Sequence, residues 1–424
     1  MRGHCELRVD ESVSASEAAP ALPVARPFLI ANLLASVGFG LIAMTICLPS
    51  MHEWPTLFGA SQAQVQLSFS SFVIGLGAGQ VFYGPLSDRY GRRKFLLGGF
   101  AIAGLSSLAA AGAPGLFEIT VARFLQGVGA AAGMVIGRAM VQDYFTGPDR
   151  PRIMAYIGMV MGLCPASAMI LGGQIHIHWG WRANFLVIAV IAAALVVMTW
   201  IAMPVEEKKQ PSRSHWVTEM FASYAHLARL PVFLGYAIIL ASCTGTFYVF
   251  LSGAPTVLAR YGVGPGMVGF YIMFIPMSYI AGNFLTTRLV KRWSENRLML
   301  AGNCAAIAGI ASVLILALSD VQSPLAVTAP LVLLGIGHGL LMPSALAGTV
   351  SLVPAMAGAA AGAAGLGQHV VGAFAGYAVG LVEHDSALNI ALLMLVFMLL
   401  SLFSQLFLLR SLRTVIKPAL ALRS

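Results

Sequence analysis

The chain has 424 residues, of which 58% are hydrophobic and only 10% are charged, and its formal net charge is +9. A soluble domain is about 45–50% apolar and about 25% charged, so these charges are too few to cover the surface of a soluble protein of this length. The composition therefore excludes a cytosolic enzyme, a disulfide scaffold and a disordered chain, and it indicates a polytopic membrane protein.

Apolar runs long enough to cross a bilayer recur along the chain. A spanning helix needs about 20 largely apolar residues. Such runs lie near residues 28–50, 65–87, 95–113, 116–142, 152–175, 182–203, 230–254, 266–289, 297–318, 324–349, 354–381 and 386–409. The runs at 95–113 and 354–381 are rich in Ala and Gly, which are common where membrane helices pack closely. All twelve are continuous rather than alternating in polarity, which favours helices over a transmembrane barrel.

The distribution of Lys and Arg sets the orientation, because cytoplasmic loops carry an excess of both. With the N-terminus inside, every one of the 25 basic residues falls on the inner side except Arg123, Arg138, Arg182 and Arg260. Both termini are therefore expected to be cytoplasmic. The positive net charge follows from this topology and from attraction to anionic lipid, and it requires no nucleic-acid partner.

The longest inner connection divides the chain into two sets of six spans. We expect a disordered cytoplasmic tail at 1–27, an N-terminal six-helix bundle at 28–203, a cytoplasmic linker at 204–229, a C-terminal six-helix bundle at 230–409 and a cytoplasmic tail at 410–424. Many secondary transporters are built from two such halves, with the substrate site between them near the midplane.

The most distinctive motif is the inner turn between spans two and three, Gly84-Pro85-Leu86-Ser87-Asp88-Arg89-Tyr90-Gly91-Arg92-Arg93-Lys94. Gly91 permits a tight reversal of the chain, and Asp88 lies at a helix end beside four cations. A loop that only obeyed the positive-inside rule would need cations, but neither the acid nor the ordered glycines.

This run resembles the signature loop of the major facilitator superfamily, G-x-L-a-D-r-x-G-r-r/k. The matching residues are Gly84, Leu86, Asp88, Arg89, Gly91, Arg92 and Arg93. A degenerate second copy follows span eight at 282–292, with Thr286 or Thr287 where the acid would stand. The resemblance implies an all-α membrane protein with the major facilitator fold, in which twelve transmembrane helices form two six-helix bundles.

A second match lies in span four, where Arg123-Phe124-Leu125-Gln126-Gly127-Val128-Gly129-Ala130-Ala131 resembles the family's R-x-x-q-G-x-g-a-a pattern. An Arg inside a membrane helix is costly and by default marks a functional site or a buried pair. The resemblance implies that Arg123 faces the central cavity as a coupling or substrate residue. The alternative is an Arg that extends to the outer interface, with Glu118 as a possible neighbour.

Several shorter sequence matches narrow the resemblance to one branch of the superfamily. They are Leu48-Pro49, Val65-Gln66-Leu67, Arg138-Ala139-Met140-Val141-Gln142-Asp143, Gly172-Gly173, Trp179-Gly180-Trp181-Arg182 and Ser252-Gly253-Ala254-Pro255. Together they resemble the bicyclomycin/chloramphenicol-resistance branch of the twelve-span drug:proton antiporters. The resemblance to that branch implies that Asp88, Arg92 and Asp143 hold the inner ends of two helices together. These contacts would break as the two halves rock. A purely structural cap is the alternative role for these charges.

Span five keeps part of the antiporter proline element. Pro165, Gly172 and Gly173 are present, although the spacing is wider than in the usual g-x-x-x-G-P-x-x-G-G pattern. These residues are expected to kink the helix and pack it closely.

The sequence offers no acid near the midplane that could carry a proton. All sixteen acids fall in the tail, in loops or at helix ends, and the cluster Glu383-His384-Asp385 is interpreted as a solvated outer loop. Drug:proton antiporters of this branch often carry an Asp just before the Leu-Pro of span one, but Thr45 occupies the corresponding place here. The titratable groups at depth are His338 and His369, which either exchange protons near physiological pH or pack as neutral residues.

Small-molecule sites usually combine aromatic walls with a few polar groups. The candidate cavity-lining residues are Gln66, Phe69, Phe72, Phe247, Tyr248, Phe250, Tyr271, Tyr279 and Tyr377. A cavity of this kind with one Arg suits a neutral or weakly charged amphiphile.

No nucleotide-binding loop, metal-ligand spacing or nucleophile motif is present, so neither an enzyme nor an ATP-driven pump is expected. The main hypothesis is a secondary transporter of the inner membrane that exports small amphipathic drugs or toxic compounds in antiport with protons. The expected partners are the substrate, protons and membrane lipid, with the proton gradient as energy source and no cofactor. The alternatives are a dedicated metabolite exporter or importer of the same fold, and a non-transporting receptor or scaffold.

Overall fold

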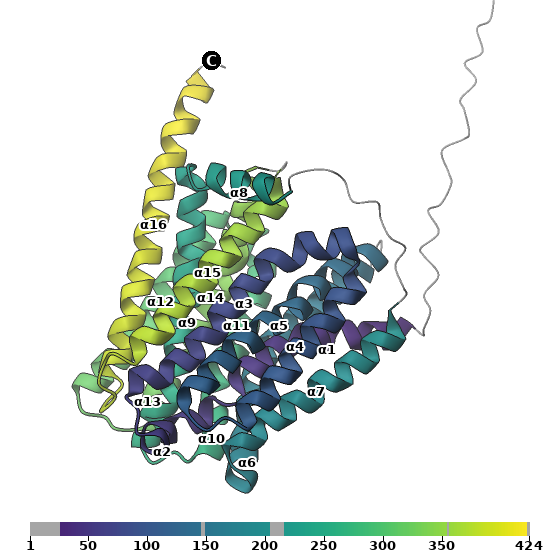
Figure 1. Ribbon diagram of the computed structural model, residues 1–424. Coiled ribbons are helices and arrows are strands. Elements are labelled where there is room, and N and C mark those ends of the chain that lie inside the picture. The colour runs from purple at the N-terminus through teal and green to yellow at the C-terminus, as the bar shows by residue number, and fades with distance from the viewer. Residues whose placement is uncertain (1–25, 146–148, 204–215, 354–355, 422–424) are drawn as a thin grey trace, which may run out of the picture.

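A computed structural model describes residues 26–145, 149–203, 216–353 and 356–421 (Figure 1). Within these ranges all regular structure is helical. The predicted tail at 1–27, the first part of the predicted linker at 204–229 and the last three residues lie largely or wholly outside the described residues.

The first half of the chain forms seven α-helices and one 3-10 turn. They are α1 (Arg26–Thr45), η1 (Leu48–Glu53), α2 (Trp54–Phe58), α3 (Gln62–Tyr90), α4 (Arg92–Ala111), α5 (Leu116–Tyr144), α6 (Asp149–Trp179) and α7 (Trp181–Ala202). The first predicted span continues to residue 50, but α1 ends at Thr45 and the chain turns through η1, which has Pro49 in its first turn.

The second half begins with a short helix and continues with longer ones. They are α8 (Trp216–Leu227), α9 (Pro231–Arg260), α10 (Pro265–Ile272), α11 (Phe274–Leu289), α12 (Glu295–Leu318), α13 (Pro324–Thr328), α14 (Val332–Ser351), α15 (Ala357–Val379) and α16 (Leu388–Ala421). Helix α8 occupies part of the segment predicted as a linker. Helix α9 runs past the predicted end at residue 254, because it accommodates Pro255 in its interior.

Each of the twelve predicted runs contains helix. Eleven helical segments of the described residues are long and apolar enough to cross a membrane. The remaining run corresponds to α15, a 23-residue helix in which Ala and Gly replace larger apolar side chains. This helix packs between α9 and α3, so its small residues permit close contact with both neighbours.

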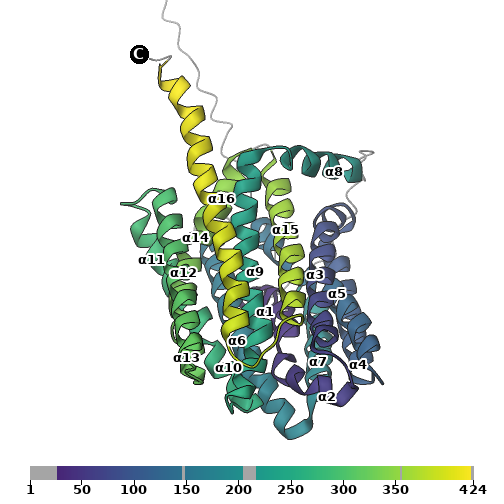
Figure 2. The same cartoon turned by 90° about the vertical axis from the view of Figure 1, so that its left-hand side faces the viewer.

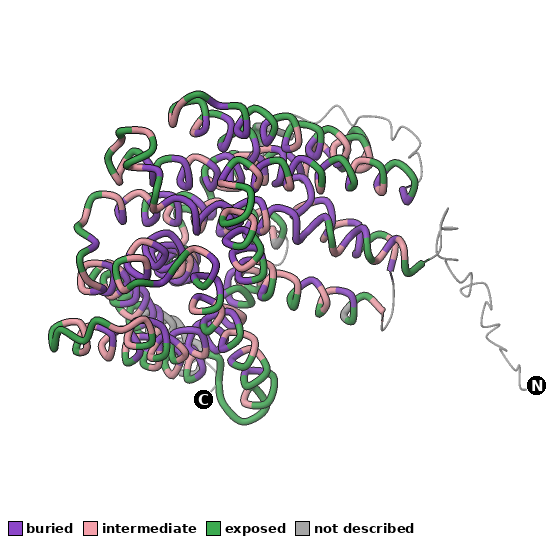
Figure 3. Tube along the Cα trace, turned by 90° about the horizontal axis from the view of Figure 1, so that it is seen from below, coloured by how far each residue is buried: buried purple, intermediate pink, exposed green. Residues whose placement is uncertain are grey.

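Two ends of the molecule can be recognised. Helix α8 and the end of α16 lie at one end, and α2, α10 and α13 lie at the other (Figures 1 and 2). The Lys and Arg distribution predicts that the α8 end is cytoplasmic. Buried residues follow the helix contacts inside the bundle, and exposed apolar residues such as Trp200 and Phe403 lie on its surface (Figure 3).

The chain before α8 packs against the chain after it mainly through α3 with α15 and through α6 with α10. Four side chains donate hydrogen bonds across this boundary: Gln62 to Thr256 (3.3 Å), Gln66 to the carbonyl of Ser252 (3.1 Å), Ser70 to that of Ala373 (2.7 Å) and Gln174 to that of Gly266 (3.1 Å). All four lie toward the end that holds α2 and α10, and we call this set the outer seam. Among the described residues, the two halves are therefore bonded to each other at the outer end.

Candidate functional site

The ends of α3, α4 and α5 meet around Arg92 at the α8 end of the molecule, which the Lys and Arg distribution predicts to be cytoplasmic. We call it the cytoplasmic end. Nη2 of Arg92 lies 2.9 Å from Oδ1 of Asp88, and its Nε lies 2.6 Å from Oδ2 of Asp143. Gly91, with φ of +102°, makes the sharp turn between the end of α3 at Tyr90 and Arg92, the first residue of α4. The Arg92 side chain is 15% exposed, against 62% and 45% for the two acids, so the cation lies at the centre of this cluster. The structure thus brings together the three charges that the family resemblance selects.

The other residues of the turn have different neighbours. Arg93 donates from Nη2 to the carbonyl of Trp200 (2.7 Å), and its guanidinium lies 4.8 Å from the centre of the indole ring. Arg89 lies over the ring of Tyr90, and Gly84 has only a Val135 methyl within 4 Å of the position its Cβ would take. Arg93 therefore anchors α4 to α7, a contact that the sequence does not signal because the partners lie 107 residues apart.

The degenerate second copy of the turn makes uncharged contacts. The hydroxyl of Thr286 bonds to the carbonyls of Gly282 (3.1 Å) and Gly339 (2.8 Å). Thr286 is 9% exposed and ties α11 to the backbone of α14. The residue in place of the acid is thus part of a helix–helix contact.

Arg123 is completely buried, which contradicts an extension to the outer interface. Its Nη1 donates to the carbonyl of Ala43 (2.6 Å), and its Nη2 donates to that of Met44 (3.0 Å). Both carbonyls belong to the last turn of α1, where a helix leaves its carbonyls unpaired and favours a positive charge. Glu118, named as a possible neighbour, is exposed and forms no ion pair with Arg123.

The bonds of Arg123 continue across the N-terminal half. Its Nη1 also donates to Oε1 of Gln126 (2.6 Å), and the Gln126 amide donates to the hydroxyl of Ser107 (2.6 Å). The guanidinium lies 4.3 Å from the centre of the Phe72 ring. Arg123 therefore connects α1, α3, α4 and α5, and Phe72, predicted to line the cavity, packs against it instead. Gln126 and Ser107 are partners that sequence reasoning did not select.

Thr45 is also bonded inside the protein. Its hydroxyl lies 2.8 Å from the carbonyl of Leu41 and 3.3 Å from that of Pro165. Nearby in α6, a Cβ on Gly172 would collide with the carbonyl of Ile46, and one on Gly173 would collide with that of Pro265. Thr45 and the proline–glycine element thus lie where α6 touches α1 and α10 at backbone distance.

The two deep histidines lie in different surroundings. His338, on α14, is 3% exposed, and its Nε2 is buried without a partner among the described residues. His369, on α15, donates from Nδ1 to the carbonyl of Gly365 (2.8 Å). A Cβ on Gly77 of α3 would lie 2.8 Å from Cβ of His369. His369 is therefore at the boundary between the halves, and His338 is on a helix packed against α11 and α12.

The predicted lining residues have different neighbours in the structure. Gln66 belongs to the outer seam, where Phe69 also stacks on Tyr248 with ring centres 5.6 Å apart. Phe247 packs on the same Tyr248, and Phe250 borders a void of about 10 Å³ between α9 and its neighbours. The tyrosines at the remaining positions, Tyr271, Tyr279 and Tyr377, are partly buried.

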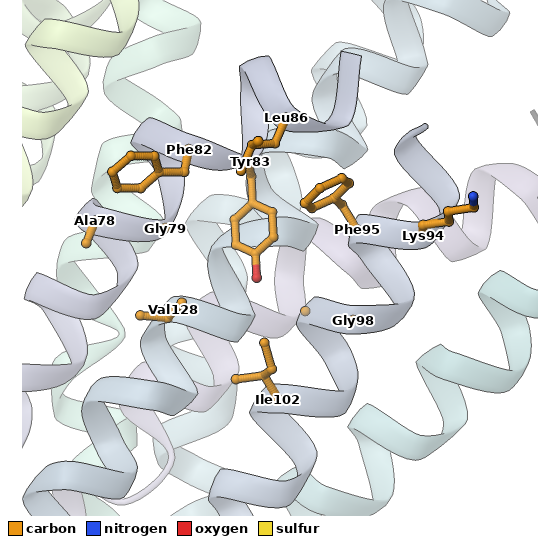
Figure 4. A pocket seen from close by; sticks show the side chains of 11 residues that line it. Ala78, Gly79, Phe82, Tyr83, Leu86, Lys94, Phe95, Gly98, Ile102 and Val128 are labelled. Atoms are coloured by element: carbon orange, nitrogen blue, oxygen red, sulfur yellow. The ribbon is translucent and has the colours of Figure 1, made fainter. Parts of the chain in front are cut away.

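A cavity of about 650 Å³ lies elsewhere, between α3, α4 and α5 (Figure 4). Its walls include Tyr83, Phe95 and Val128, with Lys94 at the rim. Phe82 and Ile102, which also line it, are 44% and 40% exposed, so it opens on the outer surface of the bundle. None of the predicted lining residues borders it, and its apolar walls match lipid chains.

In the outer connection between α15 and α16, Glu383 and Asp385 are exposed, as expected for a solvated loop, whereas His384 is buried. Arg260 pairs with Asp385 at 3.2 Å, and His384 is only 8% exposed. Burial lowers the pKa of His384, and the charge of Arg260 lowers it further. The loop is thus partly packed against the end of α9.

Comparison with known proteins places this geometry in a family. The family model of the Major Facilitator Superfamily matches residues 28–376. An uncharacterized MFS-type transporter of Bacillus subtilis is 31% identical over 68% of this chain and 72% of its own length. A chloramphenicol resistance protein of Pseudomonas aeruginosa is 29% identical over 72% and 71%, and a bicyclomycin resistance protein homolog of Haemophilus influenzae is 28% identical over 80% and 85%.

Solved structures share the fold at low identity. A D-xylose–proton symporter matches with a TM-score of 0.71 and 15% identity, over 89% of this chain and 96% of its own. An inward-facing bacterial homolog of the lysosomal transporter Spinster matches with a TM-score of 0.73 and 14% identity, over 92% and 98%. The names of the relatives confirm the resemblance to the drug:proton antiporter branch. The chain belongs to the major facilitator superfamily and is a multi-pass small-molecule transporter of the bacterial inner membrane, not an enzyme.

Proposed function

We propose that this chain exports small amphipathic drugs or toxic compounds in exchange for protons, by rocking its two halves around a site between them. The observation that carries the proposal is the Asp88–Arg92–Asp143 cluster at the cytoplasmic end. It is supported by the outer seam, which joins the halves at the opposite end. Relatives named for chloramphenicol and bicyclomycin resistance support export of drugs.

The strength of the cluster suits a conformational switch. Both acids are substantially exposed, so water screens their attraction to Arg92. Two such pairs contribute about 1–2 kcal/mol in total, which shifts the balance between two conformations by about five- to thirtyfold. A cluster of this strength biases the cycle and can still break in each turnover.

Proton coupling needs a titratable group that changes its surroundings as the halves move. Every acid of the described residues lies in a loop or near a helix end. His369 contacts α3 across the boundary between the halves, whereas His338 lies deeper in the second half. We assign the proton to His369 first and to His338 second, since an imidazole exchanges protons near neutral pH.

A dedicated metabolite transporter of the same fold is the second candidate. One observation favours it: Thr45 bonds to the carbonyl of Pro165 at the place where an acid of the branch would stand. A threonine cannot attract a cationic drug or carry a proton. Transport without proton movement would support this candidate.

Purified protein in liposomes that contain a pH-sensitive dye tests the proposal. Under an imposed proton gradient, a panel of neutral, anionic and cationic antibiotics should cause proton leakage with at least one compound. Asp88→Asn should slow that leakage about twofold to fivefold, since it removes one of the two ion pairs described for Arg92. Asp320→Asn is the matched control, because Asp320 lies in an outer loop and bonds only to the amide of Gln322. Binding with no transport of any compound would favour a receptor or scaffold.

A further inference from the structure

A second group of polar side chains lies where the two halves meet, between the outer seam and the α8 end. It consists of Gln80 on α3, Arg138 on α5 and His369 on α15, and we call it the Arg138 cluster. Oε1 of Gln80 lies 3.8 Å from the position that a Cβ on Gly365 would take, and the carbonyl of Gly365 accepts the hydrogen bond of His369. On the other side, Met134 contacts both Gln80 (Nε2 to Sδ, 4.0 Å) and Arg138 (Nε to carbonyl, 2.7 Å).

The Arg138 side chain is held away from the cytoplasmic end. Helix α5 runs from the outer end to the cytoplasmic end, and Arg138 lies six residues before its last residue, Tyr144. An Arg at this depth could extend toward the inner interface. Its Nε instead donates to the carbonyl of Met134, one turn back toward the outer end. The guanidinium is therefore directed back along α5, into the bundle.

The charge of Arg138 has no acid beside it. Asp143, the nearest acid along α5, lies five residues on and thus about 140° around the helix, and it is bonded to Arg92. Neither terminal nitrogen of Arg138 donates a hydrogen bond to a described residue, although the side chain is partly buried. Arg123, on the same helix, uses both of its terminal nitrogens. Because an unpaired cation within a membrane bundle is costly, Arg138 is suited to a partner that arrives from outside the chain.

We propose that the Arg138 cluster binds a carboxylate group of the transported compound. A guanidinium matches the planar fork of a carboxylate with two parallel hydrogen bonds. The Gln80 amide supplies a further donor from α3. Nε2 of His369 supplies one from α15 when the imidazole is protonated, because Nδ1 already donates to Gly365. The substrate is then an amphiphile with a carboxylate at one end, held by groups from both halves. This inference rests on the proposed transport function and specifies its substrate class.

A binding measurement on the full chain in detergent, with no proton gradient, tests this site. The probes are 2-naphthoate and its uncharged methyl ester, which share the same apolar ring system. The wild-type protein should bind the carboxylate at least tenfold more tightly than the ester. Arg138→Gln should weaken binding of 2-naphthoate by about tenfold to a hundredfold and leave the ester unchanged.

Two further variants keep the result interpretable. Gln80→Glu retains Arg138 but places a competing carboxylate beside it, so it should also weaken 2-naphthoate binding. Arg288→Gln removes one positive charge from an exposed position at the cytoplasmic end of α11 and should bind as the wild type does. Melting temperatures establish which variants fold. If Arg138→Gln does not fold, 2-naphthoate binding by Gln80→Glu tests the site.

Three results would overturn the assignment. They are equal affinity for the carboxylate and the ester, no binding of 2-naphthoate to the wild type, or unchanged 2-naphthoate binding in Arg138→Gln and Gln80→Glu. Failure of proton coupling would leave this binding result untouched, because the measurement uses no gradient. Conversely, proton-driven export by a wild-type protein that binds the carboxylate and the ester equally would support the proposed function and contradict the carboxylate site.

Discussion

The N-terminal half holds Arg92 and Arg123 in several bonds each, whereas the corresponding turn of the C-terminal half holds an uncharged threonine. Arg92 joins the ends of three helices, and Arg123 joins α1 to α5 with Phe72 of α3 against its guanidinium. In the second half, Thr286 bonds to the backbone of α14, and the deep titratable groups are His338 and His369. Two halves with similar helices thus differ in how their polar groups are fixed.

Because their polar side chains are bonded differently, we assign separate roles to the two halves. Multiply bonded arginines keep their positions, so the first half is suited to positioning and switching. The second half holds the two deep histidines, whose side chains can exchange protons, so it is suited to proton exchange. The following variants test this division, beginning with the one for which we expect the largest effect.

Arg123→Gln should have the largest effect. It leaves the carbonyls of Ala43 and Met44 without their donor and removes the partner of Gln126. We expect a loss of about 3 kcal/mol or more in stability, since hydrogen bonds to charged groups contribute about 1.5–3 kcal/mol each. Thermal unfolding in detergent measures it, with Arg182→Gln as a control at the outer end of α7. A wild-type melting temperature would show that the buried network is not structural.

Asp143→Asn should slow transport more than Asp88→Asn does. Asp143 makes the shorter contact with Arg92 and is the less exposed of the two acids. We expect about a tenfold reduction in turnover for Asp143→Asn, with substrate affinity largely retained. Flux and binding measured on the same preparation separate the two quantities. Reduced affinity at unchanged turnover would contradict a switching role.

His369→Gln should abolish proton movement during transport and leave a binding-competent protein. Glutamine cannot exchange a proton, but its amide can still donate a hydrogen bond to the carbonyl of Gly365, as His369 does. His338→Gln is the comparison, with a smaller expected effect because that side chain lies on α14, away from the α3–α15 contact. Unchanged proton release in both variants would show that neither histidine carries the transported proton.

Thr286→Val should have the smallest effect. It removes the bond to the carbonyl of Gly339, so we expect a loss of about 1 kcal/mol in stability and unaltered turnover. Unfolding and flux measurements together give both quantities. A reduction in turnover as large as that of Asp88→Asn would mean that the second turn is also a switch.

The helices and the switch could be predicted because their signals are local. Apolar runs mark the helices, and the Gly91 turn, with one acid followed by four cations, marks the point where Asp88 and Arg92 meet. The break after Thr45 and the helix α8 were not predicted, since neither interrupts the polarity pattern in a distinctive way.

The partners of the buried cation could not be predicted. The carbonyls that bind Arg123 belong to α1, 79 and 80 residues earlier. Every residue has a backbone carbonyl, so the sequence does not show which of them accept these hydrogen bonds. For the same reason the sequence did not show that Phe69 packs against Tyr248 or that Phe72 packs against Arg123. An aromatic residue in a membrane helix can face a neighbour, a void or lipid, and only the tertiary packing decides which.

The central claim is that compound export is coupled to proton movement by the two halves acting together. The most direct measurement records, in one set of proteoliposomes, the flux of a transported antibiotic and the internal pH for the wild type and for His369→Gln. The account predicts proton movement that accompanies flux in the wild type and is lost in the variant. Flux in the wild type with no change of internal pH would contradict it.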